Sequence, residues 1–307
     1  MPLAGSSAAV PILSNSSKVL NGPSKSGSGG CMADQLNLVF FPTSYSELFS
    51  AWNRYPSAVP YAGGTALIRG KGRQILELPS IILSLDRLEE IHRISRSERF
   101  LEIGAMVKLS QIIELGKVVP IALRRCLENI AGPQLRNMAT IGGNICFSGW
   151  RLDSTAVLNA LDAQFELRTA QSSRWISAPR FLSAPTQSAL GPQELLTRIR
   201  VPLDSWDHSI YNKFDNQANR SRVAVLLVRT QKNVLNDIKI VYKTDMILRD
   251  RDSESLLIGK QLPLSHRIAA DFISHWDDFL KSVHSIDELS RQELINFITV
   301  NINNLSE

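Results

Sequence analysis

The sequence predicts an α+β protein with two domains. Up to about Trp206, short apolar strand candidates alternate with amphipathic helix candidates, and beyond it three strand candidates precede three helical stretches. Strands that are followed by a run of helices are typical of an α+β unit. The 307 residues are enough for two domains with sizeable cores, and 44% hydrophobic with 21% charged residues is ordinary for a globular protein.

The first 33 residues form a segment of their own, expected to be a disordered head or a tag. Residues 1–31 contain eight serines, five glycines and three prolines. A segment of this composition buries too little apolar surface to offset the entropy lost on ordering. It lacks the basic start and long apolar stretch of a secretory signal, so Met32 is a candidate native start. A targeting peptide is the alternative, because the segment is rich in serine and contains no acidic residue.

Residues 34–90 are expected to form one compact part of the first domain, with a β-α-β-loop order. Thr43 or Ser44 can cap the helix candidate, because a hydroxyl oxygen accepts a hydrogen bond from a free N–H of the first turn. One face of this helix carries Tyr45, Leu48, Phe49 and Trp52. The predicted elements are a strand at 36–41, a helix at 44–52, and strands at 59–61, 75–78 and 81–85.

The rest of the chain is predicted to contain a second part of the first domain, residues 91–206, and a C-terminal domain, residues 207–307. Cys126 falls on a predicted helix with Ile121, Leu123 and Leu127 and is expected to pack in the core. The first region is predicted to hold strands at 91–95, 100–103 and 195–201, helices at 109–116, 120–130 and 154–161, and a hairpin of 165–169 with 175–177. The C-terminal region is predicted to hold strands at 209–214, 223–230 and 238–242, then helices that begin near Ser253, Ser265 and Ser290.

Two glycine pairs, in Ala62-Gly63-Gly64-Thr65 and in Ala139-Thr140-Ile141-Gly142-Gly143-Asn144, are the candidate ligand-binding segments. Glycine permits a positive φ and a close approach of a ligand to the backbone, and successive free N–H groups form a concave nest that favours an anion. A lone Gly-Gly-Thr is more often a tight turn that binds nothing. Two such turns could bind a pyrophosphate from both sides, because it offers two charged groups.

Several other functions are excluded by what the sequence lacks. Gly70-Lys71-Gly72 has no third glycine of a dinucleotide fingerprint, and no phosphate-binding loop with Gly-Lys-Ser/Thr is present. The five histidines include no pair at i, i+4 spacing and the three cysteines are too few for an iron–sulfur cluster, so no metal site is predicted. Basic residues are interleaved with acids, which argues against nucleic acid, and no apolar run reaches the length of a membrane span. The few cysteines fit a reducing compartment, so we expect a cytoplasmic protein.

The segment Gln134-Leu135-Arg136-Asn137-Met138-Ala139-Thr140-Ile141-Gly142-Gly143-Asn144-Ile145 resembles the signature of the FAD-binding subunits of molybdenum hydroxylases, the xanthine dehydrogenase and carbon monoxide dehydrogenase family. Ala62-Gly63-Gly64-Thr65 resembles the first flavin loop of that family, and the similarity extends from about Leu38 to about Lys260. The resemblance implies a two-part FAD-binding domain of the vanillyl-alcohol-oxidase/PCMH type, residues 34–206, followed by a small α+β domain. Arg249, Glu254, Leu257, Gly259 and Lys260 match a recurrent pattern of that last domain, for which helix support is the expected role.

The resemblance also implies which residues bind FAD. The backbone around Gly63 and Gly64 would face one phosphate, Thr140 and Asn144 would add side-chain hydrogen bonds, and Ile130 with Ala131 would line the adenine and ribityl region. The full set is Ala62, Gly63, Gly64, Thr65, Ala66, Leu67, Ile130, Ala131, Ala139, Thr140, Ile141, Gly142, Gly143, Asn144, Asp153 and Lys213.

Two members of this set have a second interpretation. Asp153 matches a family acid that hydrogen-bonds the flavin chain, but it could also cap the helix that starts at Ser154. Lys213 matches a lysine near the isoalloxazine ring, where a cation stabilises negative charge on the reduced flavin, but it could also be an exposed strand lysine. Residues 147–152 lack the common Ser-Pro step of the family, and 216–222 depart from its arginine and aspartate spacing.

The function implied by the resemblance is electron transfer from 2Fe-2S clusters on a partner chain, through FAD, to NAD. The molybdenum cofactor would belong to another subunit, because this chain has no cluster cysteines and no room for a domain of that size. Two alternatives remain. One is a free-standing FAD-dependent reductase or oxidase of the same fold, which would need a substrate base that does not stand out here. The other is a non-catalytic flavin relay or structural subunit, for which the irregular stretch 216–222 is the supporting feature.

Overall fold

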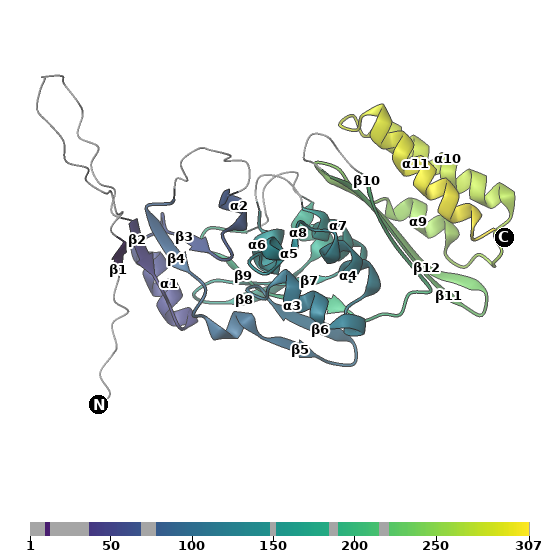
Figure 1. The fold of residues 1–307 in the computed structure, drawn as a ribbon. Helices are drawn as coiled ribbons and strands as arrows, with labels where there is room; N and C mark the ends of the chain where they lie inside the picture. Colours follow the sequence, from purple (N-terminus) through teal and green to yellow (C-terminus); the bar gives the residue numbers. More distant parts are fainter. Residues whose placement is uncertain are drawn as a thin grey trace, which may run out of the picture. The chain divides into compact units, whose positions relative to one another are not determined.

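The computed structural model of the chain describes residues 10–12, 37–68, 78–147, 152–183, 190–214 and 221–306. The chain divides into two compact units, residues 1–89 and 90–307 (Figure 1). In the described ranges, no helix combines the length and the apolar character that crossing a bilayer requires. The elements mix helices with three separate sheets, as the predicted α+β class requires.

The first unit contains a four-stranded sheet in the order β1-β2-β4-β3. Strands β3 and β2 both run parallel to β4, whereas β1 pairs antiparallel with β2. Ser44 caps the helix by accepting the Glu47 N–H at 3.3 Å, which confirms one of the two predicted caps. The elements are β1 (Val10–Ile12), β2 (Asn37–Phe40), α1 (Tyr45–Arg54), β3 (Val59–Tyr61), α2 (Thr65–Ile68) and β4 (Ile81–Ser84).

Two expectations for this unit are not confirmed by the structure. The strand β1 lies inside the segment that was expected to be disordered, because its backbone pairs with the otherwise open edge of β2. The strand predicted at 75–78 falls almost wholly outside the described residues, and the one described position, Leu78, has no regular structure.

The second unit begins with a five-stranded antiparallel sheet in the order β5-β6-β9-β7-β8. The strand predicted at 91–95 is wrong over its first half. Residues Glu89–His92 form a 3-10 helix, in which Ile91 is buried and turns its carbonyl toward the Met106 N–H at 2.9 Å. The strands are β5 (Ile94–Arg96), β6 (Phe100–Gly104), β7 (Gln164–Arg168), β8 (Ser173–Ser177) and β9 (Leu195–Pro202), and the predicted β7–β8 hairpin is confirmed.

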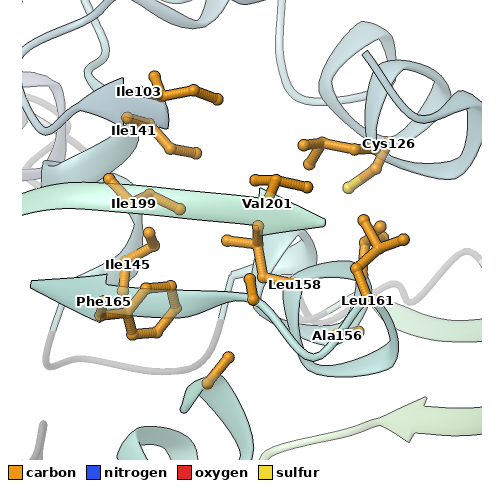
Figure 2. Packing of buried hydrophobic residues seen from close by; sticks show 14 of the residues in the cluster. Ile103, Cys126, Ile141, Ile145, Ala156, Leu158, Leu161, Phe165, Ile199 and Val201 are labelled. Carbon is orange, nitrogen blue, oxygen red and sulfur yellow. The ribbon is translucent and has the colours of Figure 1, made fainter. Parts of the chain in front are cut away.

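Helices in the same part of the chain pack on this sheet to form the first hydrophobic core. Figure 2 shows Ile199 and Val201 of β9 in one cluster with Ile141 and Leu158 from two helices. Cys126 is fully buried in this cluster, as predicted, and burial raises the pKa of its thiol. The helices are α3 (Leu109–Glu114), the 3-10 helix Gly116–Val118, α4 (Ile121–Glu128), α5 (Pro133–Arg136), α6 (Ile141–Ile145), α7 (Asp153–Ala160) and α8 (Ala178–Leu182).

The C-terminal sheet has the order β10-β11-β12-β13 and is buried on both faces. Val223, Val225 and Leu227 of β11 join the first core, whereas the alternate residues Ala224 and Leu226 join a second core with the C-terminal helices. Figure 1 shows these helices together on one face of the sheet. The elements are β10 (His208–Phe214), β11 (Arg222–Gln231), β12 (Val234–Lys243), β13 (Ile247–Leu248), α9 (Arg251–Leu257), α10 (His266–Ser282) and α11 (Glu288–Asn303).

Two of these three helices begin earlier than the serines predicted. Asp250 caps α9 by accepting the N–H groups of Asp252 and Ser253, and Asp287 caps α11 by accepting the Ser290 N–H at 2.7 Å. α10 begins directly after Ser265, which caps it by accepting the Ile268 N–H. An upstream aspartate is as good a cap as serine, and it lets α9 and α11 begin before the predicted serines.

Candidate functional site

The first glycine segment is a turn between β3 and α2. Gly64 has a φ of +70°, a left-handed conformation, which confirms that this turn needs glycine. A Cβ added there would lie 2.1 Å from the Tyr61 hydroxyl oxygen, so the ring also requires a residue without a side chain. Ala62 and Gly63 are partly exposed, as is Thr65, while Ala66 is exposed; the Leu67 side chain lies outside the description.

The second glycine segment differs from the open nest that the sequence predicted. Ala139 and Thr140 lead into the short helix α6, and neither Gly142 nor Gly143 has a positive φ. The first four N–H groups all donate within the protein. Ile141 donates to Val107 O at 3.0 Å, Gly142 to Ala105 O at 2.8 Å, Gly143 to Thr140 Oγ1 at 3.1 Å, and Asn144 to Thr140 O at 2.9 Å. The expectation of free amides here is therefore wrong, because the helix start is used to dock and cap α6.

The two glycines of α6 serve different surroundings. A Cβ on Gly142 would lie 2.7 Å from the Cβ of Ala105, so this glycine lets α6 pack on the β6 end of the sheet. Gly143, in contrast, is exposed. Asn144 is buried and accepts a short hydrogen bond from the Ser154 hydroxyl, which joins α6 to α7. Gly143 is therefore the glycine of this segment at which a ligand can reach the backbone.

A loop fixed by one arginine follows α4. The Nη1 atom of Arg136 donates to the carbonyl oxygens of Glu128, Ile130 and Ala131 at 2.9, 3.1 and 2.6 Å. Ala131 has a φ of +49°, an uncommon conformation for alanine that this triple contact holds in place. Ile130 is partly buried and Ala131 is exposed, so the loop presents a small apolar surface.

Asp153 is a buried anchor and does not cap α7. Leu152 occupies the cap position and Asp153 is the first helical residue, only 6% exposed. Its Oδ2 lies 3.0 Å from Lys213 Nζ, and its Oδ1 lies 3.1 Å from Lys243 Nζ. The same Oδ1 accepts a short hydrogen bond from the Ser221 hydroxyl. The capping interpretation of Asp153 is therefore wrong, because its carboxylate binds residues that are distant in the sequence.

Lys213 is held in place as well. Besides its ion pair with Asp153, its Nζ donates to the Asn129 carbonyl oxygen at 3.2 Å. An ammonium group has three N–H donors, and partners among the described residues use two of them. The Lys213 side chain is 29% exposed. It is thus a tethered cation that faces solvent in part, which differs from the freely exposed strand lysine of the second interpretation.

The register of the C-terminal sheet brings the two lysines to one carboxylate. Lys213 of β10 pairs with Val223 of β11, and Val223 pairs with Lys243 of β12. Residues in one such row point to the same face of a sheet, so the two lysines flank Val223 and Asp153 bridges them. Sequence reasoning missed Lys243, Ser221 and Asn129. A lysine that follows the apolar run Ile240-Val241-Tyr242 was the available signal for Lys243.

The electrostatics of this cluster reflect burial set against opposite charge. Burial would raise the pKa of Asp153, but Lys243, Ser221 and Lys213 together hold it below its usual value. Burial lowers the pKa of Lys243, and the nearby Asp153 carboxylate opposes this. Tyr211, which lies on the same strand as Lys213, has its pKa raised by burial and by the neighbouring Cys126 and Asp153.

The comparisons with known proteins identify the family. The family described as FAD binding domain in molybdopterin dehydrogenase matches residues 33–204. The chain belongs to this family. The predicted resemblance to molybdenum hydroxylase flavin subunits is thereby confirmed.

Two curated relatives carry medium-chain names. The glyceraldehyde dehydrogenase medium chain of Sulfolobus acidocaldarius is 32% identical over 210 residues, which is 66% of this chain and 74% of that protein. The carbon monoxide dehydrogenase medium chain of Afipia carboxidovorans is 28% identical over 213 residues, which is 67% of this chain and 73% of that protein.

A solved structure supports the fold. A crystal structure of the Cu,Mo-CO dehydrogenase has a TM-score of 0.74 and 21% identity, and the match covers 87% of this chain and 96% of that one. The predicted fold class is confirmed by this likeness.

The residues of this FAD-binding domain fit the cofactor in chemical type. Gly64 has the left-handed turn that favours close approach, and the exposed Gly143 offers a second place where backbone is accessible. Lys213 presents a partly exposed ammonium that two described partners hold in place. The amides at the start of α6 are the exception, because they are already paired.

The far end of α7 carries a second ion cluster. Asp162 lies 2.7 Å from Arg249 Nη1 and 2.6 Å from Lys239 Nζ, and Arg249 also pairs with Glu254 at 2.9 Å. Arg249 Nη1 further donates to the Asn159 carbonyl oxygen, and Glu254 accepts the Ile240 N–H. This part of the family pattern therefore joins α7 to β12 and α9.

Two further features bear on ligand binding. A hollow of about 380 Å³ lies beside the second cluster and is lined by both signs of charge, from Arg249, Asp250, Arg251 and Asp252. Within the portion of the chain that the structure describes, no three histidine, cysteine, aspartate or glutamate side chains come together as metal ligands.

Proposed function

We propose that this chain is the FAD-binding electron-transfer subunit of a xanthine-dehydrogenase-like molybdenum hydroxylase. Electrons would come from 2Fe-2S clusters on a partner chain, and NAD would be the acceptor. The family match over residues 33–204 supports the flavin part of this proposal, and the tethered Lys213 ammonium is the observation that carries the electron-transfer part. When bound, FAD supplies two-electron chemistry that links one-electron clusters to a hydride acceptor.

The residues of this chain would bind and orient the cofactor. The turn of Ala62, Gly63, Gly64, Thr65 and Ala66, with Leu67 after it, would hold one phosphate through backbone amides. The exposed backbone at Gly143 would admit the ribityl side of the cofactor, and Ile130 with Ala131 would cover its apolar parts. The remaining proposed contacts are Ala139, Thr140, Ile141, Gly142, Asn144, Asp153 and Lys213.

Lys213 would stabilise the negative charge that reduction places on the ring. Its ammonium is fixed by Asp153 Oδ2 and by the Asn129 carbonyl, so little reorganisation is needed when a charge develops nearby. The molybdenum cofactor and the 2Fe-2S clusters would belong to two partner subunits, as the medium-chain names of the relatives support. The few cysteines support a cytoplasmic complex.

The first experiment identifies the cofactor that the purified chain binds. The purified chain should be yellow and should release FAD, and no FMN, on denaturation. Gly143→Val should weaken FAD binding by at least about tenfold, or about 1.4 kcal/mol, because a branched side chain would cover exposed backbone. Gly191→Val is the matched control, since the nearest atom that a Cβ there would meet among the described residues is Glu194 Oε2 at 3.6 Å. A colourless chain that cannot be reconstituted with FAD would contradict the proposal.

A second measurement separates the proposal from its alternatives. Bound FAD in the complex with molybdenum and iron–sulfur chains should be bleached by substrate and recovered by NAD. Substrate hydroxylation by the isolated chain would favour a free-standing enzyme. Bleaching that NAD never reverses would favour a flavin relay subunit.

A further inference from the structure

Lys243 is a buried lysine with every ammonium donor in use. Its side chain is 2% exposed. Its Nζ donates to Asp153 Oδ1 at 3.1 Å, to the Ser221 carbonyl oxygen at 2.5 Å and to Ser221 Oγ at 3.3 Å. Lysine is almost never fully buried unless it is paired, because the ammonium loses its hydration. The burial of Lys243 is therefore explained by the groups that its ammonium binds.

Lys243 fixes the orientation of the Asp153 carboxylate. It shares Oδ1 with the Ser221 hydroxyl, which leaves Oδ2 for Lys213. Asp153 Oδ1 thus faces the buried Lys243, and Oδ2 faces the partly exposed Lys213. The position of the Lys213 ammonium is set by Oδ2 together with the Asn129 carbonyl oxygen.

Lys243 also decides the charge that Lys213 presents. Two ammonium groups face the single carboxylate of Asp153, so among the residues that the structure describes this cluster carries one more positive than negative charge. Without Lys243, Asp153 would form a simple pair with Lys213 and would largely cancel its charge toward a ligand.

We propose that Lys243 is a positioning residue for the flavin: by holding Asp153 through Oδ1, it anchors Lys213 on Oδ2 and keeps a net positive charge there. This inference rests on the proposed function, in which Lys213 faces the flavin ring. Lys243 does not touch the cofactor and acts through Asp153.

The test is a redox titration of the FAD-bound chain, in which each variant is compared with the unaltered protein. Lys243→Met should lower the ratio of reduced to oxidised flavin at a fixed potential about tenfold, which is about 30 mV for a two-electron couple. Lys213→Met should lower it at least as much. Lys239→Met is the matched control, since Lys239 is on the same strand and pairs with Asp162 at the other end of α7. It should change the ratio less than about twofold, or about 9 mV.

The double variant Asp153→Asn/Lys243→Met, compared with Asp153→Asn alone, separates positioning from a general charge effect. If Lys243 acts through Asp153, adding Lys243→Met where no carboxylate is left should change the ratio less than about twofold. A tenfold fall in that background would show a direct charge effect and would overturn the positioning role. Should Lys243→Met fail to fold, Lys243→Gln keeps an N–H donor for Asp153 and should lower the ratio in the same direction.

The failures can be told apart. A chain without FAD, or a Lys213→Met variant with an unchanged ratio, would contradict the proposed function. A Lys213→Met shift combined with a Lys243→Met variant that behaves like Lys239→Met would overturn the role of Lys243 and leave the proposed function standing.

Discussion

Helix α7 is tied to the C-terminal sheet at both of its ends, and the two ties differ in charge and exposure. At the start, the Asp153 carboxylate meets two lysines, Lys213 and Lys243. At the end, the ion pairs link four acids with four bases: Asp162, Asp204, Asp237 and Glu254 with Arg229, Lys239, Arg249 and Arg251. Among the residues that the structure describes, the first cluster has one more base than acid and the second is balanced.

The difference indicates which of the two clusters can bind a ligand. In the second cluster Arg249 is engaged by Asp162, by Glu254 and by the Asn159 carbonyl, which makes it a joint between elements. In the first cluster Lys213 has two partners in the described part of the chain, and its side chain is 29% exposed. Buried ion pairs often only connect structural elements. The unbalanced and partly exposed cluster around Asp153 is therefore the one that indicates a functional site.

The largest effect is expected where the balanced cluster is broken. Arg249→Met should lower the free energy of unfolding by about 3 kcal/mol, because it leaves Glu254 buried without its partner. Urea unfolding followed by circular dichroism measures this. FAD affinity of the folded fraction should stay the same, and a loss of FAD binding without a loss of stability would reverse the assignment of the two clusters.

A middle-sized effect is expected in acid. The pKa values of Asp153 and Asp162 both lie below the usual value, since their cationic partners outweigh burial. A depressed carboxyl pKa contributes stability that is present above the unfolded-state pKa, about 4, and is lost as the pH falls through the folded-state pKa.

Urea unfolding between about pH 6 and pH 3 tests this at each end of α7. Asp153→Asn should flatten the loss of stability below pH 4 by up to about 1.4 kcal/mol per pH unit. Asp162→Asn should flatten it less, because the Asp162 side chain is 36% exposed and that of Asp153 is 7% exposed. Equal slopes would mean that burial does not distinguish the two acids.

The smallest effect is expected from a second arginine at Asp162. Arg251 lies 3.6 Å from Asp162 Oδ1, but its side chain is 65% exposed. Arg251→Gln should change the free energy of unfolding by less than about 0.5 kcal/mol, because exposed pairs are screened by water. The same urea titration as for Arg249→Met measures it, and a loss above about 1 kcal/mol would show that exposure is a poor guide at this cluster.

Much of the fold could be predicted from local patterns. The α1 cap at Ser44, the α10 cap at Ser265 and the β7–β8 hairpin follow from signals within a few residues. A left-handed turn in the first glycine segment was also predicted, since a glycine pair after a strand permits a positive φ. Elements whose ends depend on competition between nearby caps, such as α9 and α11, were predicted less well.

The candidate site could be predicted only in part. Asp153 and Lys213 were identified by resemblance, but their pairing with each other and with Lys243 was not. The second glycine segment was identified too, yet its amides are used by Val107, Ala105 and Thr140. Nothing close to Gly142 in the sequence indicates that Ala105 will supply the acceptor.

The sequence by itself determined the α+β class, the longer strands and helices, the two glycine segments and the family to which the chain belongs. The tertiary structure alone decided what Asp153 does, because its partners lie about 60 and 90 residues away in sequence. Helix periods and caps act over three or four residues and can be read locally. The bridge between Lys213 and Lys243 exists only when strand register places both lysines in one row with Val223 and α7 packs its first residue above it.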